Sequence, residues 1–409
     1  MIPFTLFLLP PLLFASSSLT PVHRFRTAGA AGCSFDAALS LLACANFWDG
    51  TSPNMAAQSV LYHVAVNGSG LTLRPQQRFP GSGAHGADFF SAGGSHFLAI
   101  PSYYGCGSER GPAQPGCGST AIYRREGARF VEHQRLPTAG PSQTTHLPLP
   151  GAAGGGGGGT TWLLTGENFD DKICFWELRD GLFEKRGACL HVPGAGAMAV
   201  AVEGRDGWSG PTLLVAASYH DRGWATQSRV FRFVAGGARG GRFEEVQRID
   251  TVGAHGVALR HLGGELLLFF AEDRGPNGPL VNSSLLRWEG GRFVKVQGLP
   301  TDGAHGARLF SLGGVPHLFC ANFGDRLGSP PRYAARSAMW RAAGPRGEPP
   351  WTLAAEVPSQ GATDVAILEG VGGFTFAVLS NEGDLGRRAH QVSVVYRVDP
   401  GPEKEGGEL

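Results

Sequence analysis

Short runs of alternating apolar and polar residues recur along the chain, and Gly, Pro, Asn or Asp bound each run. Runs of this length and alternation predict β-strands joined by tight turns. Each unit opens with a short apolar strand, here called strand a, and a Gly-Gly turn leads into a more apolar strand b, as in "HLGGELLLFF". Strand c follows a variable loop, as in "SSLLRW", and strand d runs through segments such as "FVKVQGLPTDG". The pattern therefore predicts an all-β protein built from four-stranded units.

The four-stranded unit recurs seven times. Its strand c lies near residues 59, 120, 172, 228, 283, 337 and 393. Such units match the blades of a β-propeller, because a lone twisted sheet cannot cover both of its faces. The last unit has no strand d, whereas residues 23–32 near the N-terminus resemble one. We therefore predict a seven-bladed β-propeller of four-stranded blades, closed by the N-terminal strand pairing into the last blade.

The two ends of the chain differ from the repeat. Residues 1–19 hold an apolar run too short to span a bilayer, followed by small residues, and this predicts a signal peptide. We place the propeller at 22–400 and a disordered polar tail at 401–409. Two sequons, at Asn67 and Asn282, fit a secreted glycoprotein. The expected location is secreted or on the extracellular surface, with no membrane span.

Composition narrows the partners. Hydrophobic residues make up 42% of the chain and charged residues 17%, and the formal net charge is +1. The chain can thus bury a core, and nothing in it favours nucleic acid as a partner.

Seven Cys residues leave at least one without a partner in the chain. Cys33 either pairs with Cys44 or stays free, and Cys320 is expected to be a small buried strand residue. Two further pairings are predicted from a loop and a hairpin, Cys106–Cys117 and Cys174–Cys189. No Cys-x-x-Cys spacing suggests a zinc site.

The motif Gly-Ala-His-Gly occurs three times, at His85, His255 and His305. It could mark a three-histidine metal site or a repeated turn from strand d into strand a. We favour the turn, with each His hydrogen-bonding its own blade, because one blade lies across the ring and structural metal sites usually need four ligands. We predict no metal site and no cofactor, and we leave open a Ca²⁺ ion in the central channel, near the inner-strand acids Asp36, Asp88 and Asp364.

An Asp follows strand b in six units, and a Ser or Thr opens strand c in six. The Asp residues could form an acidic ring, but we favour Asx-turns that cap the loop backbone. A nucleophile would not be copied into six blades, and no catalytic motif is present, so we predict that the protein is not an enzyme. The Asp positions are Asp49, Asp171, Asp221, Asp273, Asp325 and Asp384.

The pattern "GAHGxxLFxxGGxxxLxxANxxD…SxLxRWxxGxFxxVQxLPTxG" resembles the EAR repeat, also called the EPTP or epitempin repeat. This repeat occurs in the leucine-rich glioma-inactivated proteins and in the thrombospondin-type laminin G domain and EAR repeat protein. The resemblance covers about residues 22–400 and is weakest in the third unit, which carries the glycine tract 154–159. It implies a seven-bladed propeller that acts in extracellular protein recognition rather than catalysis.

The loops between strands b and c vary most and carry aromatic and Arg residues of the kind that dominate recognition surfaces. We therefore predict that this face binds a protein, such as a cell-surface receptor, without catalysis. One alternative is a carbohydrate-binding propeller. A second is a propeller enzyme with a carboxylate pair in the channel, which would need two close acids without a cationic neighbour. The candidate binding residues are Phe47, Trp48, Asp49, Tyr103, Tyr104, Tyr219, His220, Trp224, Phe323 and Arg326.

Overall fold

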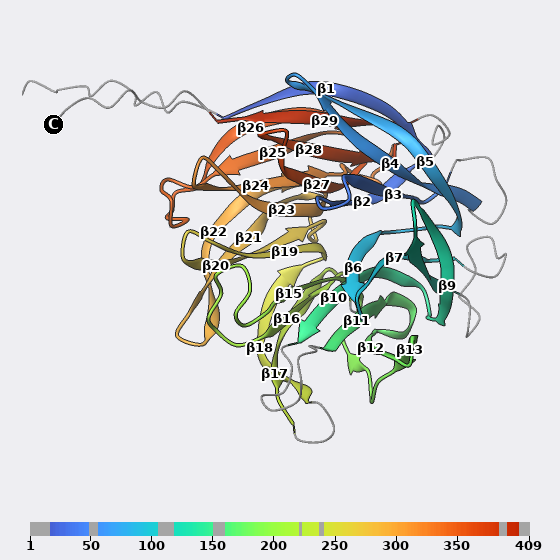
Figure 1. Ribbon diagram of the computed structural model, residues 1–409. Coiled ribbons are helices and arrows are strands. Elements are labelled where there is room, and N and C mark those ends of the chain that lie inside the picture. The colour runs from blue at the N-terminus through green and yellow to red at the C-terminus, as the bar shows by residue number, and fades with distance from the viewer. Residues whose placement is uncertain are drawn as a thin grey trace, which may run out of the picture.

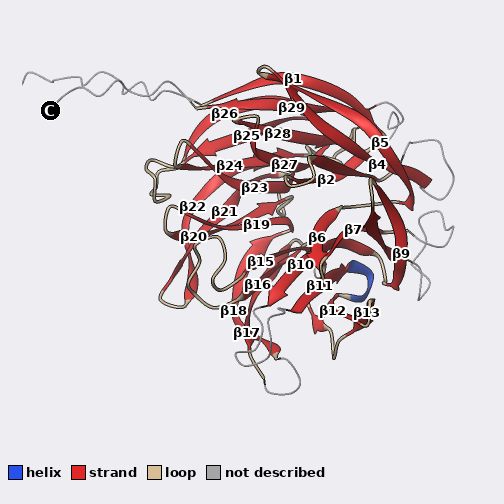
Figure 2. Ribbon diagram, viewed as in Figure 1, coloured by secondary structure: helices blue, strands red, loops and turns tan. Residues whose placement is uncertain are grey.

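The computed structural model describes residues 17–48, 56–104, 118–149, 160–220, 223–236, 241–383 and 391–400. Seven antiparallel sheets surround a central channel, which confirms the predicted all-β, seven-bladed propeller (Figure 1). Strands make up almost all of the regular structure (Figure 2). In six sheets the strands follow chain order from the channel outwards, as the sequence units predict, and in the seventh the outermost strand comes from the N-terminus.

The first four blades each begin at the channel. Blade 1 comprises β2 (Ala30–Asp36), β3 (Leu41–Asn46), β4 (Ala56–Asn67) and β5 (Gly70–Ser82). Blade 2 comprises β6 (Asp88–Ala92), β7 (Ser95–Ser102), β8 (Ser119–Glu126) and β9 (Arg129–Pro137). Blade 3 comprises β10 (Pro141–Leu149), β11 (Thr160–Glu167), β12 (Lys172–Arg179), β13 (Leu182–Lys185) and β14 (Leu190–His191), with a 3₁₀ turn, η2 (Asn168–Asp170). Blade 4 comprises β15 (Ala195–Ala201), β16 (Leu213–Ser218), β17 (Ala225–Val234) and β18 (Arg242–Val252).

The last three blades complete the ring. Blade 5 comprises β19 (Ala254–Leu262), β20 (Glu265–Glu272), β21 (Leu280–Glu289) and β22 (Arg292–Asp302). Blade 6 comprises β23 (Ala304–Leu312), β24 (Val315–Asn322), β25 (Ala334–Arg341) and β26 (Thr352–Gln360). Blade 7 comprises β27 (Ala362–Val371), β28 (Phe374–Asn381), β29 (Gln391–Asp399) and, from the N-terminus, β1 (Ser18–Thr27).

The pairing of β1 with β29 confirms the predicted ring closure. Ser18 lies opposite Asp399, and Thr27 lies opposite Gln391. The strand starts at Ser18, before residue 22, and the signal peptide at 1–19 stays a prediction. Residues 1–16 and the predicted tail 401–409 lie outside the described residues. Among the residues that are described, no helix has the length and apolar character needed to cross a membrane.

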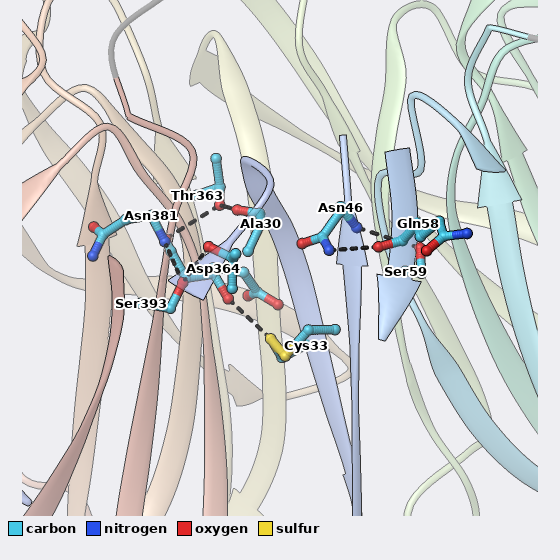
Figure 3. Close-up of a disulfide and its surroundings, with 12 residues drawn as sticks. Ala30, Cys33, Asn46, Gln58, Ser59, Thr363, Asp364, Asn381 and Ser393 are labelled. Atoms are coloured by element: carbon cyan, nitrogen blue, oxygen red, sulfur yellow. Dashed lines mark hydrogen bonds between the residues drawn. A yellow bond between two sulfur atoms is a disulfide. The ribbon is translucent and has the colours of Figure 1, made fainter. Parts of the chain in front are cut away.

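The core lies between neighbouring blades, where apolar faces of adjacent sheets meet. An aromatic residue of strand c is buried here, as shown by Tyr62 packing edge-on against Phe25 of blade 7 with ring centroids 5.3 Å apart. The Ser that opens strand c accepts a hydrogen bond from the end of strand b, as Ser59 Oγ does from Asn46 N and Ser393 Oγ from Asn381 N (Figure 3). These contacts confirm that the repeated Ser is structural.

A Gln in strand d links blades in a way the sequence pattern did not predict. Gln77 donates through Nε2 to the carbonyl of Phe130 in the next blade and accepts from its N–H through Oε1. The same pair of hydrogen bonds joins three further Gln residues to the next blade, at Gln134–Phe183, Gln247–Phe293 and Gln297–Trp351. The Gln at this position of strand d therefore connects one outer strand to the next.

Two disulfides occur within the described residues. Cys174–Cys189 is confirmed, and Cys33 pairs with Cys44 on the adjacent strand of blade 1. Cys320 is a buried free thiol, as expected. The predicted Cys106–Cys117 pair lies outside the described residues. Disulfides of this kind fit a protein that folds in an oxidising compartment.

Candidate functional site

A repeated backbone irregularity brings side chains to one end of the channel. In six blades one residue of strand a has no partner on strand b, so strand a forms a β-bulge at that residue. His255 and His305 are two of these residues, and His85 precedes β6 at the corresponding place. The seven equivalent residues all line one cavity: Ala31, His85, Ser142, Gly196, His255, His305 and Thr363.

A second repeated position lines the same end of the channel. In every blade, the first residue after strand b donates its N–H to the carbonyl of a Gly that precedes strand a, at 2.7–3.1 Å, as Phe323 N does to Gly303 at 2.7 Å. These Gly residues have φ between 56° and 63°, a left-handed conformation that favours glycine. The seven residues that follow strand b are Phe47, Tyr103, Asn168, Tyr219, Asp273, Phe323 and Glu382.

These two rings of residues surround a cavity of about 480 Å³, here called the mouth cavity. Seven of the ten predicted binding residues line it: Phe47, Tyr103, Tyr104, Tyr219, His220, Phe323 and Arg326. Trp48 and Trp224 are not part of its lining, and Asp49 lies outside the described residues. The sequence therefore identified residues that come together, although they form a cavity and not an exposed face.

The first aromatic wall of the mouth cavity comes from blades 1 and 2 and comprises Phe47, His85, Tyr103 and Tyr104. The His85 ring lies between Phe47 and Tyr103, with centroids 4.9 and 4.8 Å away. Tyr103 donates its hydroxyl to Asn168 Oδ1 at 3.0 Å. Phe47 is buried, and Tyr103 and Tyr104 are half-buried. The rings thus support one another across the boundary between blades.

The second aromatic wall comes from blades 4 to 6 and comprises Tyr219, His255, His305 and Phe323. His255 and His305 stack with centroids 4.0 Å apart, and His305 stacks on Phe323 at 4.3 Å. Tyr219 packs edge-on against His255 at 4.9 Å. His255 packs against rings of blades 4 and 6, whereas His305 also stacks on Phe323 of its own blade. The expected hydrogen bond of each His to its own blade stays a prediction.

A buried carboxylate lies behind the second wall. Asp273 is 2% exposed, and its Oδ2 accepts a hydrogen bond from the Tyr219 hydroxyl at 2.9 Å. His305 Nε2 lies 3.5 Å from Asp273 Oδ1, at the outer limit of a hydrogen bond. Arg326 Nη2 bonds the Tyr219 oxygen and lies 3.7 Å from Asp273 Oδ2. The four residues form one polar network across blades 4, 5 and 6.

The environment fixes the charge of this network at neutral pH. Burial, together with the neighbouring His305 and Arg326, lowers the pKa of His255 well below its usual value, so this ring is neutral. Burial opposes ionisation of Asp273, but His305 and Arg326 outweigh it and hold the pKa of this carboxyl below its usual range. Burial and the charge of Asp273 raise the pKa of Tyr219, which keeps its proton.

Three of the six Asp residues that follow strand b lie within the described residues, and these three have different partners. Asp171 Oδ1 accepts from Gly194 N at 2.6 Å, which is the expected capping role. Asp325 pairs with Arg274. Asp273 stands at a different position, because it follows β20 directly and occupies the place of Phe323 or Tyr103 in other blades. Asp49, Asp221 and Asp384 lie outside the described residues.

Two of the three predicted channel acids, Asp364 and Asp88, lie beside a basic side chain. Asp364 accepts from Arg308 Nη2 at 3.0 Å, and Asp88 lies 3.4 Å from His146 Nδ1. Asp36 Oδ1 accepts from Leu39 N in a turn. No group of three or more His, Cys, Asp or Glu side chains within the described ranges could hold a metal ion. The described acids therefore do not meet the condition set for a carboxylate-pair enzyme.

Solved structures that resemble this chain include Sqt1 of Saccharomyces cerevisiae, which is 11% identical, with a TM-score of 0.54 over 94% of this chain and 100% of that one. The polysaccharide lyase Uly1 is 10% identical, with a TM-score of 0.50 over 93% and 99% of the two chains. A putative 6-phosphogluconolactonase of Bacteroides fragilis is 13% identical, with a TM-score of 0.50 over 81% and 85%. At these identities the likeness shows the fold alone.

No protein-family model matches the chain, and neither does any curated protein. The resemblance to the EAR repeat therefore stays a prediction.

The prediction of a non-catalytic propeller that binds a protein through its loop face is wrong. Its solved neighbours include proteins whose titles name a putative lactonase and a polysaccharide lyase, so the fold does not indicate a non-catalytic protein binder. In the structure, seven of the ten residues assigned to that face line the mouth cavity, and two of them, Phe47 and Phe323, are 9% and 2% exposed. These two rings offer little surface to a protein.

Proposed function

We propose that the mouth cavity binds a carbohydrate. The observation that carries this proposal is the combination of two aromatic walls around one cavity of about 480 Å³, a size typical of small-molecule sites. Aromatic rings offer apolar faces to the C–H groups of a sugar ring. Hydroxyl groups of the sugar need donors and acceptors between those faces.

Such polar groups lie between the two walls. On the side of blade 3 the lining comprises Ser142, Gln143, Thr144 and Asn168. On the side of blade 7, Asp364 and Glu382 contribute acceptors. The cavity thus alternates apolar faces with hydrogen-bonding groups around its rim.

The charges of the lining also suit an uncharged, polyhydroxylated ligand. The cations Arg308 and Arg326 are matched by Asp364 and Glu382, and His255 is held neutral by burial. The solved neighbours titled polysaccharide lyase and putative 6-phosphogluconolactonase support a sugar-related role. In the same proposal, the two disulfides support secretion of the protein.

The test is a titration of the full-length protein with neutral and acidic mono- and disaccharides, followed by ligand-observed NMR and calorimetry. Tyr104→Ala removes a ring from the first wall, and a stacked ring contributes about 0.5–1.5 kcal/mol, so affinity should fall about threefold to tenfold. Phe374→Ala, in blade 7 and outside the lining of the mouth cavity, is the matched control and should leave affinity unchanged.

The proposal fails if no saccharide binds at millimolar concentration, or if Tyr104→Ala and Phe374→Ala bind the same saccharide equally well. The NMR spectra of the same samples, followed over hours, also report whether a bound sugar is converted into a product.

A further inference from the structure

The connection between the two inner strands of blade 4 departs from the repeat. In blades 2, 5, 6 and 7 this connection is a pair of Gly residues, as at Gly263–Gly264. In blade 4 it is the longer segment 202–212, here called the blade 4 loop. Trp208 is fixed within the loop, because its N–H donates to the Arg205 carbonyl at 2.7 Å and its Nε1 to the Pro211 carbonyl at 2.9 Å. An insertion into one unit of a repeat protein often carries a binding function.

The blade 4 loop borders a second cavity of the channel, here called the lower cavity, which lies where the inner strands end. Its volume of about 470 Å³ is typical of small-molecule sites. Arg205, Asp206 and Trp208 of the loop belong to its lining. The loop also contacts blade 5, because His261 Nδ1 lies 3.0 Å from the carbonyl oxygen of Asp206. The residues that line both this cavity and the mouth cavity are Cys33, Ala87, Gln143, Thr144, Val257 and Arg308.

The lower cavity is lined by charges of both signs. Its ionisable side chains are Asp88, His146, Arg205, Asp206, Arg260, His261, Arg308 and Glu369. Six of these have a polar partner in the described part of the chain: Arg260 with Glu369, Arg308 with Asp364, His146 with Asp88, and His261 with the Asp206 carbonyl. The charged groups of the adjacent residues Arg205 and Asp206 make no hydrogen bond or ion pair with any described residue. The blade 4 loop therefore brings one unpaired charge of each sign to the cavity.

The two unpaired charges lie near different neighbouring blades. Arg205 lies near blade 3, since burial and the charge of Arg205 both oppose protonation of His146 there, although its partner Asp88 outweighs them and raises the pKa of the ring. Asp206 lies near blade 5, since the pKa of Arg260 is raised by the hydrogen bonds to its partner carboxylate and further by the charge of Asp206. The side of the lower cavity towards blade 3 therefore carries excess positive charge, and the side towards blade 5 excess negative charge.

We propose that the lower cavity is a second ligand site, for a small zwitterion of the kind that a short peptide with free ends provides. The peptide carboxylate binds the Arg205 guanidinium, whose paired N–H donors match a carboxylate, and protonated His146 is a second donor beside it. The peptide ammonium group binds the Asp206 carboxylate. A ligand with only one charge would leave the other loop charge unpaired, and the two charges need some separation because they lie near different blades.

The rest of the lining suits the same ligand. Between the charged groups lie apolar side chains, among them Val200, Leu259 and Ile367, which can cover the side chains of a peptide. Arg205 and Asp206 are exposed, so a ligand can reach them. Neither of these two residues lines the mouth cavity, so the proposed peptide site does not depend on the proposed carbohydrate site.

Calorimetry on the full-length protein tests the proposal with dialanine and trialanine, each compared with its N-acetyl derivative and its amide. The N-acetyl derivative has no ammonium group, and the amide has no carboxylate. The tighter of the two free peptides is expected to bind at least about tenfold more tightly than either of its derivatives, because each derivative loses one charge-assisted contact. Equal binding of the three forms, tighter binding of a derivative, or no binding of either free peptide at millimolar concentration would each overturn the proposal.

Two substitutions in the blade 4 loop assign each charge of the peptide to its partner. Arg205→Gln should weaken the free peptide and its N-acetyl derivative about tenfold and leave the amide unchanged. Asp206→Asn should weaken the free peptide and its amide and leave the N-acetyl derivative unchanged. The matched control is Asp180→Asn, which changes an Asp-Gly turn with φ 47° at the Asp, against 49° at Asp206, outside the cavity lining. It should change no affinity, and a loop variant that weakens all three forms alike would overturn the assignment.

Discussion

Glu272 offers a sharp test of how burial controls charge next to the mouth cavity. The residue ends β20, is 1% exposed, and accepts a hydrogen bond from Val252 N at 3.2 Å through Oε1. Burial raises its pKa from 4.5 to about 7, although the Val252 N–H and the charge of Lys295 act in the opposite direction. Blades 1, 6 and 7 have Asn at the same place. We therefore expect Glu272→Gln to fold and to keep the bond to Val252.

The sign and size of the effect follow from proton linkage. Between pH 4.5 and 7 the folded protein keeps a proton on Glu272 that the unfolded chain has already lost. The free energy of unfolding therefore falls as pH rises through this window and levels off above it. Each pH unit between the two pKa values corresponds to 1.36 kcal/mol, so the fall between pH 5 and pH 8 is roughly 2 to 3 kcal/mol.

Urea unfolding of the wild type and of Glu272→Gln at pH 5, 6, 7 and 8 measures this difference. Other titrating groups affect both proteins equally, so the variant should gain about 2 to 3 kcal/mol relative to the wild type between pH 5 and pH 8. Glu167→Gln is the matched control, because Glu167 ends strand b of blade 3 but lies 3.5 Å from Lys172 Nζ. That variant loses an ion pair and should be less stable than the wild type across the range. The reasoning is refuted if Glu272→Gln and the wild type show the same dependence on pH.

Three further predictions concern the repeat itself. Gln297→Ala should lower the free energy of unfolding, measured in urea, by about 2 kcal/mol because it removes two hydrogen bonds to Trp351. The control Gln76→Ala removes one exposed hydrogen bond, so its free energy of unfolding should lie within about 0.5 kcal/mol of the wild-type value. The Cys320 thiol should not react with a thiol reagent until the protein unfolds, because burial strongly raises its pKa and shields it; rapid reaction under native conditions would contradict this. Gly303→Ala should destabilise the protein by more than about 2 kcal/mol in thermal or urea unfolding. Residue 303 has φ 63°, and a Cβ there would lie 2.1 Å from the Gly324 carbonyl oxygen. A variant as stable as the wild type would show that the turn relaxes.

The repeated pattern predicted the fold well because each unit carries its own signals for strands and turns. The partner of β1 could be predicted because strand d is missing from the last unit and present at the N-terminus. The contacts between blades could not be predicted in the same way. The Gln of strand d was visible as a repeated letter, but only the packing of one blade on the next reveals that it reaches Phe130 or Trp351. Packing of adjacent blades likewise decides which rings the histidines contact.

The position of Asp273 explains why the site was only half predicted. In the sequence, "AEDR" aligns with "ANFGD" if the Asp residues are matched, and this makes Asp273 equivalent to Asp325. In the structure, the N–H bond to the Gly before strand a sets the equivalence, and Asp273 N bonds Gly253 just as Phe323 N bonds Gly303. Asp273 therefore occupies a position that is aromatic in four other blades. Its carboxylate accepts a hydrogen bond from the Tyr219 hydroxyl and forms an ion pair with Arg326. The left-handed Gly of each unit thus fixes which residue stands at this position, and in blade 5 an Asp that directly follows strand b puts a buried charge where four other blades have an aromatic ring.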